Sequence, residues 1–259
     1  MVQVARARGR RPPQGWLDAL RQVALFVAAY MLYRLVRGLV DADAGQAALA
    51  NGLALVDFER ALGLFFEPGL QAWALGRSWL LDSAGFMYIN SHFIVTTTFL
   101  VWLYLRRNDA FYYVRNMFMV AMGLALVGYL VFPTAPPRFF PELGFSDTVA
   151  GLVGQDSSEA ASVLYNPFAA VPSMHVAFAL MIAVPAIRLV APRALKGAWA
   201  IYPLLVTFVV VVTANHFWVD AALGALVAAV AAYAAHAGLA RARPEAWSWR
   251  PAIHAEAAA

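Results

Sequence analysis

Six long apolar stretches, separated by polar segments, run along the chain. Each approaches the roughly 20 residues that a helix needs to cross a bilayer. A helix satisfies its own backbone hydrogen bonds in lipid, and apolar blocks of this length do not suit the strands of a barrel. We therefore predict an all-α polytopic membrane protein, a six-transmembrane-helix bundle over 17–240. The predicted spans are 17–40, 85–105, 111–132, 172–190, 198–214 and 218–239.

The segment between the first two spans, residues 46–81, has a mixed pattern. It is apolar overall but contains Asp57, Glu59, Arg60, Glu67, Pro68 and Arg77. Such a segment more often lies in the membrane interface as short amphipathic helices than spans the bilayer. We predict amphipathic interfacial helices here. If the segment spans instead, the later loops still alternate, and only their side relative to the N-terminus changes.

Composition excludes a soluble enzyme. The 259 residues are 62% hydrophobic and 13% charged, and a soluble domain of this length has too little interior for so many apolar side chains. The absence of cysteine excludes disulfides, thiolate metal sites and cysteine nucleophiles. Residues 22–33 resemble the apolar core of a cleavable signal peptide. We favour an uncleaved first span, because Arg34 and Arg37 interrupt the apolar run.

The distribution of charge predicts the orientation. Basic residues precede the first span, separate spans two from three and four from five, and follow span six, whereas the alternate connections are acidic. Short basic loops stay cytoplasmic, so the net charge of +4 indicates membrane orientation rather than a nucleic-acid partner. We predict one membrane domain over 1–259 in the cell membrane. Its N-terminus (1–16) and its tail (241–259) are both expected to be cytoplasmic.

Polar residues gather at the outer ends of spans three to six. The connection 133–171 is long and rich in proline and glycine, and loops of that length are usually functional or disordered. Ionisable groups at membrane depth are functional candidates. The residues that the predicted topology places together on the extracytoplasmic side are Arg138, Ser173, His175, His216 and Asp220.

These residue types suit phosphoryl transfer through a histidine. His216 and Asp220 are spaced i, i+4 and would share a helix face. The carboxylate can then hold one ring nitrogen as N–H and leave the other free to attack phosphorus. His175 could protonate the leaving oxygen as general acid and later activate the acceptor as base.

Two further features suit the phosphate itself. Pro172 fits the first turn of a helix, whose free N–H groups, beside the Ser173 hydroxyl, would face an anion. Arg138 offers a planar fork for phosphate oxygens. Asn90, His92 and Asn215 are predicted to position substrate. No spaced aspartate cluster is found in any span, so we predict a reaction without metal or cofactor.

Each histidine also has a simpler interpretation, because a single intramembrane histidine usually bonds a neighbouring helix. The hypothesis therefore rests on the combined set of residues and not on any one histidine. We predict no catalytic role for His236 and His254. A haem-binding or transport protein is the non-enzyme alternative, with His92, His175 or His216 as ligands. Asp220 and the Pro172-Ser173 turn have no role in that alternative.

Two motifs resemble the second and third signature motifs of the type-2 phosphatidic acid phosphatase superfamily: Pro-Ser-Met-His (172–175) and Asn-His-Phe-Trp-Val-Asp (215–220). Pro-Pro-Arg (136–138) resembles the first motif of the branch that contains inositol phosphorylceramide and sphingomyelin synthases. The resemblance covers about 85–240. It implies a six-helix bundle, no metal, a phosphohistidine on His216 oriented by Asp220, and His175 as acid and base.

Departures from the wider superfamily are typical of the synthase-like branch. Val131 stands where the first motif has lysine, Phe139 follows Arg138 where proline is usual, and Val209-Val210 replace a Ser-Arg pair. The predicted function is cleavage of a lipid phosphate at the outer leaflet, with transfer to a small inositol-like alcohol or to water. A plain polyprenyl or phosphatidate phosphatase is the alternative. The expected partners are the lipid phosphate substrate, membrane lipids and the acceptor.

Overall fold

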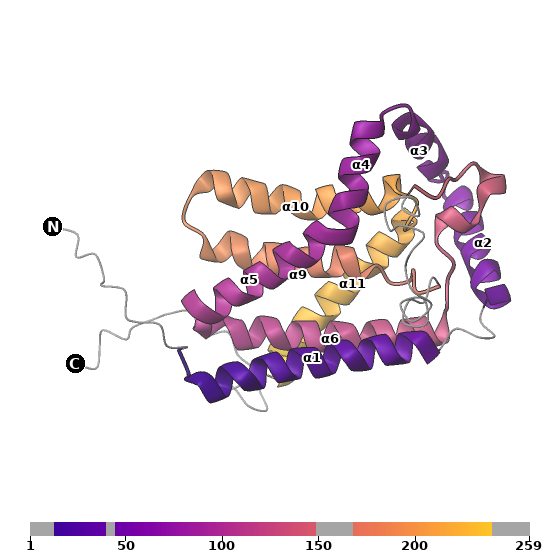
Figure 1. Cartoon of the computed structure of the whole chain (residues 1–259). Helices are drawn as coiled ribbons and strands as arrows, with labels where there is room; N and C mark the ends of the chain where they lie inside the picture. The colour runs from indigo at the N-terminus through magenta and orange to yellow at the C-terminus, as the bar shows by residue number, and fades with distance from the viewer. Residues whose placement is uncertain (1–12, 40–44, 149–167, 240–259) are drawn as a thin grey trace, which may run out of the picture.

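The described part of the computed structural model comprises residues 13–39, 45–148 and 168–239 (Figure 1). Within these ranges every regular secondary-structure element is a helix, and one isolated bridge pairs Thr134 with Ala169. The helices are α1 (Trp16–Leu39), α2 (Gly45–Ala61), α3 (Glu67–Leu75), α4 (Ser78–Phe86), the π-helix η1 (Met87–Ser91), α5 (His92–Arg106), α6 (Asn108–Val131), the 3-10 turns η2 (Pro137–Phe139) and η3 (Pro141–Leu143), α9 (Met174–Leu189), α10 (Arg193–Val212), α11 (Trp218–Tyr233) and the π-helix η4 (Ala234–Leu239).

Every predicted span falls on helical residues in the described part of the chain, which confirms the all-α class. Three described helices are long and apolar enough to cross a membrane, namely α6, α10 and α11 with the start of η4. A bent pair formed by α4 and α5 would make a fourth span, and α9 is a shorter apolar helix. These helices support a multi-pass membrane protein. The count of six spans stays a prediction.

The second predicted span differs from the structure. Instead of one helix over 85–105, α4 and α5 meet at an angle of 45° across the π-helical turn η1. The predicted interfacial segment 46–81 is helical as α2 and α3, but its last residues belong to α4. No proline causes this break, and π-helical turns are a recognised origin of kinks.

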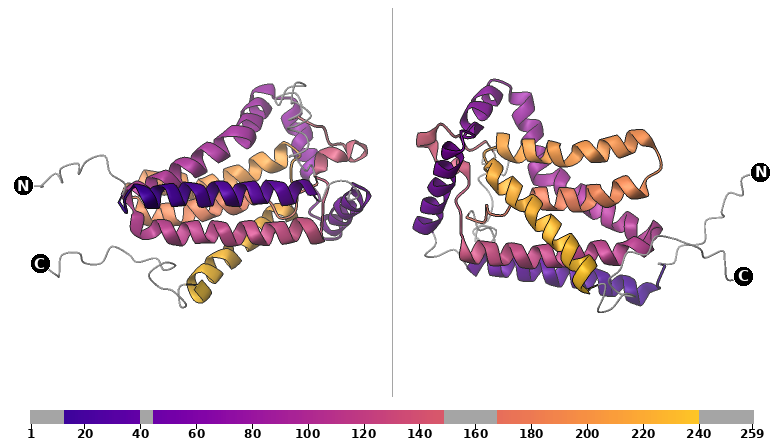
Figure 2. Two further views of the ribbon diagram at one scale, coloured as in Figure 1. Left: turned by 60° about the horizontal axis from the view of Figure 1, so that its bottom comes forward. Right: turned by 180° about the vertical axis from the view of Figure 1, so that it is seen from behind.

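The main core lies between α5, α6, α9 and α11 and is built from aromatic and small side chains such as Phe118, Ala177 and Ala228. α1 lies alongside α6, and α10 runs beside α9 (Figures 1 and 2). Outward-facing leucines stay exposed, with Leu20 at 64% and Leu204 at 70%. A soluble surface would not carry such a density of exposed apolar side chains, whereas lipid tails would cover them.

A second apolar cluster lies at one end of the bundle. There α2 packs against the segment that follows α6 and against the start of α11, through Leu55, Phe140, Phe145 and Phe217. Figure 1 shows α2, η2 and η3 grouped at this end. Two backbone bonds, Ala135 N–H to Ala48 O and Thr134 N–H to Phe168 O, fasten the segment in place. This end carries the candidate site.

Candidate active site

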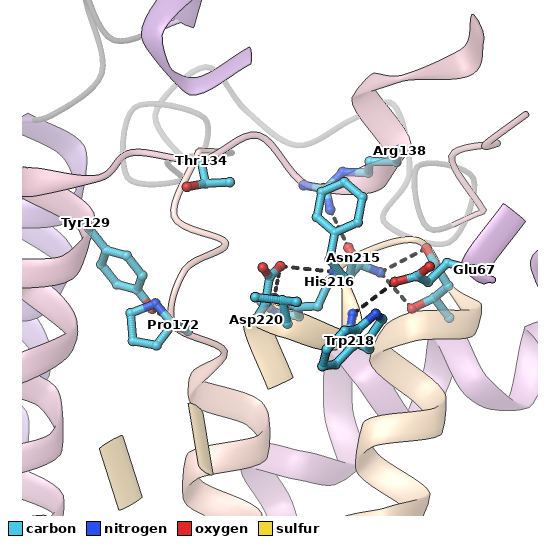
Figure 3. A network of polar contacts seen from close by, with 12 residues as sticks. Glu67, Tyr129, Thr134, Arg138, Pro172, Asn215, His216, Trp218 and Asp220 are labelled. Carbon is cyan, nitrogen blue, oxygen red and sulfur yellow. Dashed lines mark hydrogen bonds and ion pairs between the residues drawn. The ribbon is translucent and has the colours of Figure 1, made fainter. Parts of the chain in front are cut away.

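The turn between α10 and α11 holds His216. α10 ends at Val212 and α11 begins at Trp218. Asp220 accepts the Phe217 backbone N–H at 3.0 Å and contacts His216 Nδ1 at 3.3 Å, both through Oδ2 (Figure 3). His216 is only 5% exposed, and Asp220 is fully buried.

The contact between His216 and Asp220 arises differently from the prediction. Its two residues do not lie on one helix face, because His216 precedes the helix by two positions. Asp220 instead occupies the first turn of α11, where a carboxylate can accept the unpaired N–H groups of the helix start, and from there reaches back to the imidazole. A neutral imidazole that donates Nδ1–H to this carboxylate has its lone pair on Nε2.

The start of α9 brings Ser173 and His175 to the same place. The helix begins at Met174 rather than at Pro172, and Ser173 is its N-cap residue. The Ser173 N–H donates to the backbone oxygen of Asp220 at 3.0 Å. The His175 ring centroid lies 5.9 Å from that of His216 and 4.5 Å from that of Tyr88, on which it stacks. The two histidines therefore face one small volume.

The Ser173 hydroxyl is a buried polar group without a hydrogen-bond partner among the described residues. Buried polar groups are usually satisfied, so an unpaired hydroxyl at a helix start suits an anionic ligand. The backbone N–H groups at Met174 to Val176 belong to the first turn and have no acceptor within their own helix. Together they form a partly positive surface beside the imidazoles.

Arg138 lies in η2 and is held from three directions. Its backbone N–H donates to Ala214 O at 3.0 Å, its guanidinium donates to Asn215 Oδ1, and its Nε lies 3.8 Å from Asp147 Oδ2. The side chain is 8% exposed. These contacts fix Arg138 to the same turn that carries His216 (Figure 3).

Asn215, Asn90 and His92 were predicted to position substrate. Asn215 accepts a hydrogen bond from Arg138 and donates to the Thr213 carbonyl and hydroxyl oxygens, at 3.2 and 2.8 Å. Its predicted role in positioning substrate stays a prediction. Asn90 has one described side-chain hydrogen bond, of 3.5 Å, to Phe86 O within its own helical segment. His92 opens α5, and its side chain lies outside the described part of the structure.

Sequence reasoning did not single out two buried carboxyl groups at the start of α11. Glu59 Oε1 accepts the Val219 N–H at 3.2 Å, and Glu67 Oε1 accepts the Trp218 N–H at 3.1 Å. Both side chains have zero exposed surface. They come from α2 and α3, so two carboxyl groups from elsewhere in the chain cap the start of α11 (Figure 3 shows Glu67).

Burial and the neighbouring Glu67 carboxyl raise the pKa of Glu59 to about 9. Glu59 therefore carries a proton at neutral pH. A protonated carboxyl oxygen is a donor, and the neighbouring Glu67 carboxyl is the group that can accept this proton. The only sequence signal was the presence of two glutamates among the charged residues of a largely apolar segment.

A sequence profile described as the PAP2 superfamily matches residues 53–234. This range covers well over half of the chain and contains every residue of the cluster just described. The chain belongs to the PAP2 superfamily. Searches of curated proteins and of solved structures gave no match. Membership points to phosphatase-type activity on lipid phosphates and agrees with the residue types in the cluster.

This PAP2-superfamily chain shows no group of three or more histidine, cysteine or acidic side chains arranged to hold a metal within the described ranges. The titratable groups pair instead through hydrogen bonds, as His216 does with Asp220. The arrangement can present a nucleophilic imidazole, a second imidazole and one guanidinium to an anion. The matched range starts in α2 and leaves out α1.

Proposed function

We propose that the protein is an integral-membrane enzyme that cleaves a lipid phosphate ester through a phosphohistidine on His216. The observation that carries this proposal is the packing of four groups at one end of the bundle. They are an imidazole bonded to a carboxylate, a second imidazole 5.9 Å away between ring centroids, an unpaired buried hydroxyl, and a fixed guanidinium.

In the first half-reaction His216 Nε2 attacks phosphorus, a nitrogen–phosphorus bond forms and the phosphorus–oxygen bond to the lipid breaks. His175 gives its proton to the departing alcohol oxygen. Asp220 stabilises the positive charge that develops on the His216 ring. Arg138 and the start of α9 bind the phosphoryl oxygens, whose negative charge they offset.

In the second half-reaction an acceptor hydroxyl attacks the phosphohistidine. His175, now neutral, takes the proton from that hydroxyl, the nitrogen–phosphorus bond breaks, and free His216 returns. Water gives hydrolysis and an alcohol gives transfer. Both reactions use the same residues, so the chain would act as a phosphatase or as a phosphotransferase depending on which acceptor enters.

An alcohol acceptor of the inositol type is our finer proposal. It is supported by the Pro-Pro-Arg motif and by valine at positions 131, 209 and 210. Val209 and Val210 are buried in α10 among apolar side chains, so no cation from α10 adds to Arg138 there. A single guanidinium fits a monophosphate ester better than a diphosphate. Hydrolysis by a plain phosphatase remains the second candidate.

We also propose that the reaction takes place at the outer face of a six-span bundle with both termini cytoplasmic. The support is the alternation of basic and acidic connections along the sequence. No cofactor is proposed.

The test is to isolate the phosphoenzyme. Purified protein would be mixed for milliseconds with ³²P-labelled phosphatidate, quenched, and checked for acid-labile, base-stable phosphate on the protein. We expect label on wild type and none on His216→Ala. The matched control is His236→Ala, because His236 is exposed and lies in η4, at the far end of α11 from the candidate site. Label that persists in His216→Ala would overturn the phosphohistidine assignment.

Product analysis separates the two reactions. Mass spectrometry of products formed from candidate lipid phosphates, with and without inositol, should show a phosphorylated alcohol if transfer occurs and only inorganic phosphate if it does not. An absorption spectrum of the purified protein tests the haem alternative, for which a Soret band is required.

A further inference from the structure

A cavity of about 800 Å³ lies between α1 and α6, away from the candidate site. Its polar lining comes from Gln14, Asp18, Arg21, Gln22, Tyr112 and Arg115. The candidate site follows the C-terminal end of α6, whereas Arg115 lies near the N-terminal end. At 1.5 Å per residue, the sixteen residues from Arg115 to Val131 separate the two by roughly 24 Å. The cavity and the candidate site therefore occupy opposite ends of the bundle, as the course of α6 in Figure 1 shows.

The cavity has a positive charge that no contact ion pair neutralises within the described residues. Arg115 donates to neutral amide oxygens, to Gln22 Oε1 at 2.6 Å and to Asn116 Oδ1 at 2.7 and 3.1 Å. Arg21 is exposed at the rim. Described ion pairs of 4 Å or less include neither arginine.

Asp18 is the one carboxylate in the lining, and its oxygens are already engaged. Asp18 accepts the hydroxyls of Tyr104 and Tyr112 at 2.9 and 2.8 Å and the amide of Gln22 at 2.9 Å. The two arginines therefore outnumber the single carboxylate. An anionic ligand would add the missing negative charge and could accept two hydrogen bonds from either guanidinium.

The remaining lining is apolar and lies further along α1. Ala24, Leu25 and Ala28 line the cavity beyond the polar residues, and Leu25 is half exposed. The polar part thus lies at the helix ends and the apolar part toward the middle of the bundle. A ligand that matches both parts has an anionic head and a hydrocarbon tail.

The sequence that precedes α1 agrees with such a ligand. Four arginines, at positions 6, 8, 10 and 11, precede Gln14. Basic clusters beside a membrane helix attract anionic lipids, and basic pockets between helices bind their head groups. The cavity joins α1, which lies outside the range that matches the PAP2 superfamily, to α6, which lies inside it.

We propose that the α1–α6 cavity binds the phosphate of an anionic phospholipid, with Arg115 and Arg21 as its cationic partners and the surface around Leu25 against its acyl chains. The bound lipid would join α1 to α6 at the membrane face opposite the candidate site. The proposal does not depend on the catalytic function, because none of these residues belongs to the His216 cluster.

The test is native mass spectrometry of the full chain in detergent, titrated with phosphatidylglycerol or with phosphatidylcholine. We expect the first phosphatidylglycerol to bind at least fivefold more tightly than phosphatidylcholine. Arg21→Gln and Arg115→Gln should each weaken that first binding by at least fivefold. The matched control is Arg106→Gln, because Arg106 is an exposed arginine at the end of α5 outside the cavity lining. It should leave the affinity unchanged.

Two further measurements show where the lipid binds and whether its acyl chains contribute to binding. Arg138→Ala should keep the first phosphatidylglycerol, and its loss there would place the lipid at the candidate active site and overturn the proposal. Glycerol phosphate without acyl chains should not compete at equal concentration. Equal competition would reduce the ligand to a free phosphate ester and overturn the lipid assignment.

Folding of the variants is checked by thermal unfolding. Arg21 is exposed and makes no hydrogen bond or ion pair within the described residues, so Arg21→Gln remains informative even if Arg115→Gln unfolds. Unchanged phosphatidylglycerol affinity in Arg21→Gln, or an equal loss in Arg106→Gln, would show that no specific site exists here.

Discussion

His216 and His175 are both imidazoles at one end of the bundle, yet their surroundings differ. His216 is buried and bonded to Asp220, whereas His175 is half-buried and stacked on Tyr88. A carboxylate partner suits a ring that becomes positively charged after attack. A ring at the edge of the buried cluster suits proton exchange with a leaving group or an acceptor. The proposed division of roles follows from this asymmetry.

The two roles can be separated by varying the leaving group. His216→Ala should lose essentially all activity with every ester. His175→Ala should lose most with poor leaving groups and least with nitrophenyl phosphate, because a nitrophenolate departs without a proton. The measurement is single-turnover rates over esters graded in leaving-group pKa. Equal losses along the series in His175→Ala would remove the acid assignment.

A substitution at Arg138 tests whether phosphate binding needs the planar guanidinium or only a positive charge. Arg138→Lys keeps the charge but loses the planar fork and its bond to Asn215. We expect a loss of about 2–4 kcal/mol in transition-state stabilisation, or roughly 30- to 1000-fold in kcat/KM. Arg60→Lys serves as the control, since Arg60 is a half-exposed arginine outside the cluster. Near-normal kcat/KM in Arg138→Ala would show that another cation binds the phosphate.

At the residue scale, the sequence indicated which side chains meet but not how they meet. Motif spacing led to His216, Asp220, His175, Ser173 and Arg138, which the structure brings together. The role of Asn215 was not predictable, because its bond to Arg138 joins positions 77 residues apart. The capping role of Glu59 and Glu67 was not predictable either. Their contacts with α11 join residues far apart in the sequence, and only tertiary packing buries them.

At the element scale, α9 and α11 must approach closely for the two histidines to share one volume. Gly224 permits this approach, because a Cβ atom at that position would lie 2.2 Å from the Ser173 backbone oxygen. Both atoms belong to the backbone or its Cβ, so the contact could be relieved only if one of the two helices moved. The absence of a side chain at Gly224 is therefore as necessary to the site as the side chains that form it.

Gly224→Ala should separate the start of α9 from α11 and lower kcat by at least tenfold, together with a loss of thermal stability. The matched control is Gly123→Ala, since a Cβ at Gly123 in α6 meets nothing within 4 Å. Alanine is the better helix former, so this control should keep activity and gain up to about 1 kcal/mol in stability. Normal activity in Gly224→Ala would contradict the close approach.

Glu59 and Glu67 connect α2 and α3 to the start of α11, which carries Asp220. The pKa of Glu59 is raised from 4.5 to about 9, so folding favours its protonated form. The resulting stability is fully present below about pH 4.5 and is lost as the pH rises through about 9. Thermal unfolding measured from pH 5 to 9 should therefore show a melting temperature that falls across the whole of this range.

Glu59→Gln imitates the protonated form and should remove that pH dependence, because glutamine keeps an acceptor for the Val219 N–H and adds a donor toward Glu67. Glu59→Ala should instead cost about 1–3 kcal/mol at every pH, since it leaves buried groups unpaired. The same pH profile in Glu59→Gln as in wild type would show that the titration belongs to another group.

The helices themselves were largely predictable. Long apolar runs led to helices whose ends agree closely with the structure in two cases, α1 (Trp16–Leu39) for 17–40 and α6 (Asn108–Val131) for 111–132. The agreement is poorer for 198–214, because α10 already begins at Arg193. The break at η1 was not visible, because it contains neither proline nor glycine. α9 begins two residues after the predicted start at 172, and the Ser173 N–H that precedes it donates to the backbone oxygen of Asp220 in another helix.

At the scale of the whole molecule, the bundle has two chemically different ends. One end carries the candidate site, and the other carries the α1–α6 cavity with its arginines. The alternation of basic and acidic connections predicts that the first end is extracytoplasmic. A lipid phosphate in the outer leaflet could then reach His216 without crossing the membrane, while the cavity would face anionic lipid in the inner leaflet.

Because the chain has no cysteine, single substitutions can report this orientation without background. Glu142→Cys places a thiol on exposed η3 beside the candidate site, and Arg106→Cys places one at the exposed end of α5. In intact cells an impermeant maleimide should label Glu142→Cys and leave Arg106→Cys unlabelled until the membrane is broken. The reverse pattern would place the candidate site in the cytoplasm and would favour a spanning role for residues 46–81, because one extra crossing before the second span reverses every later connection.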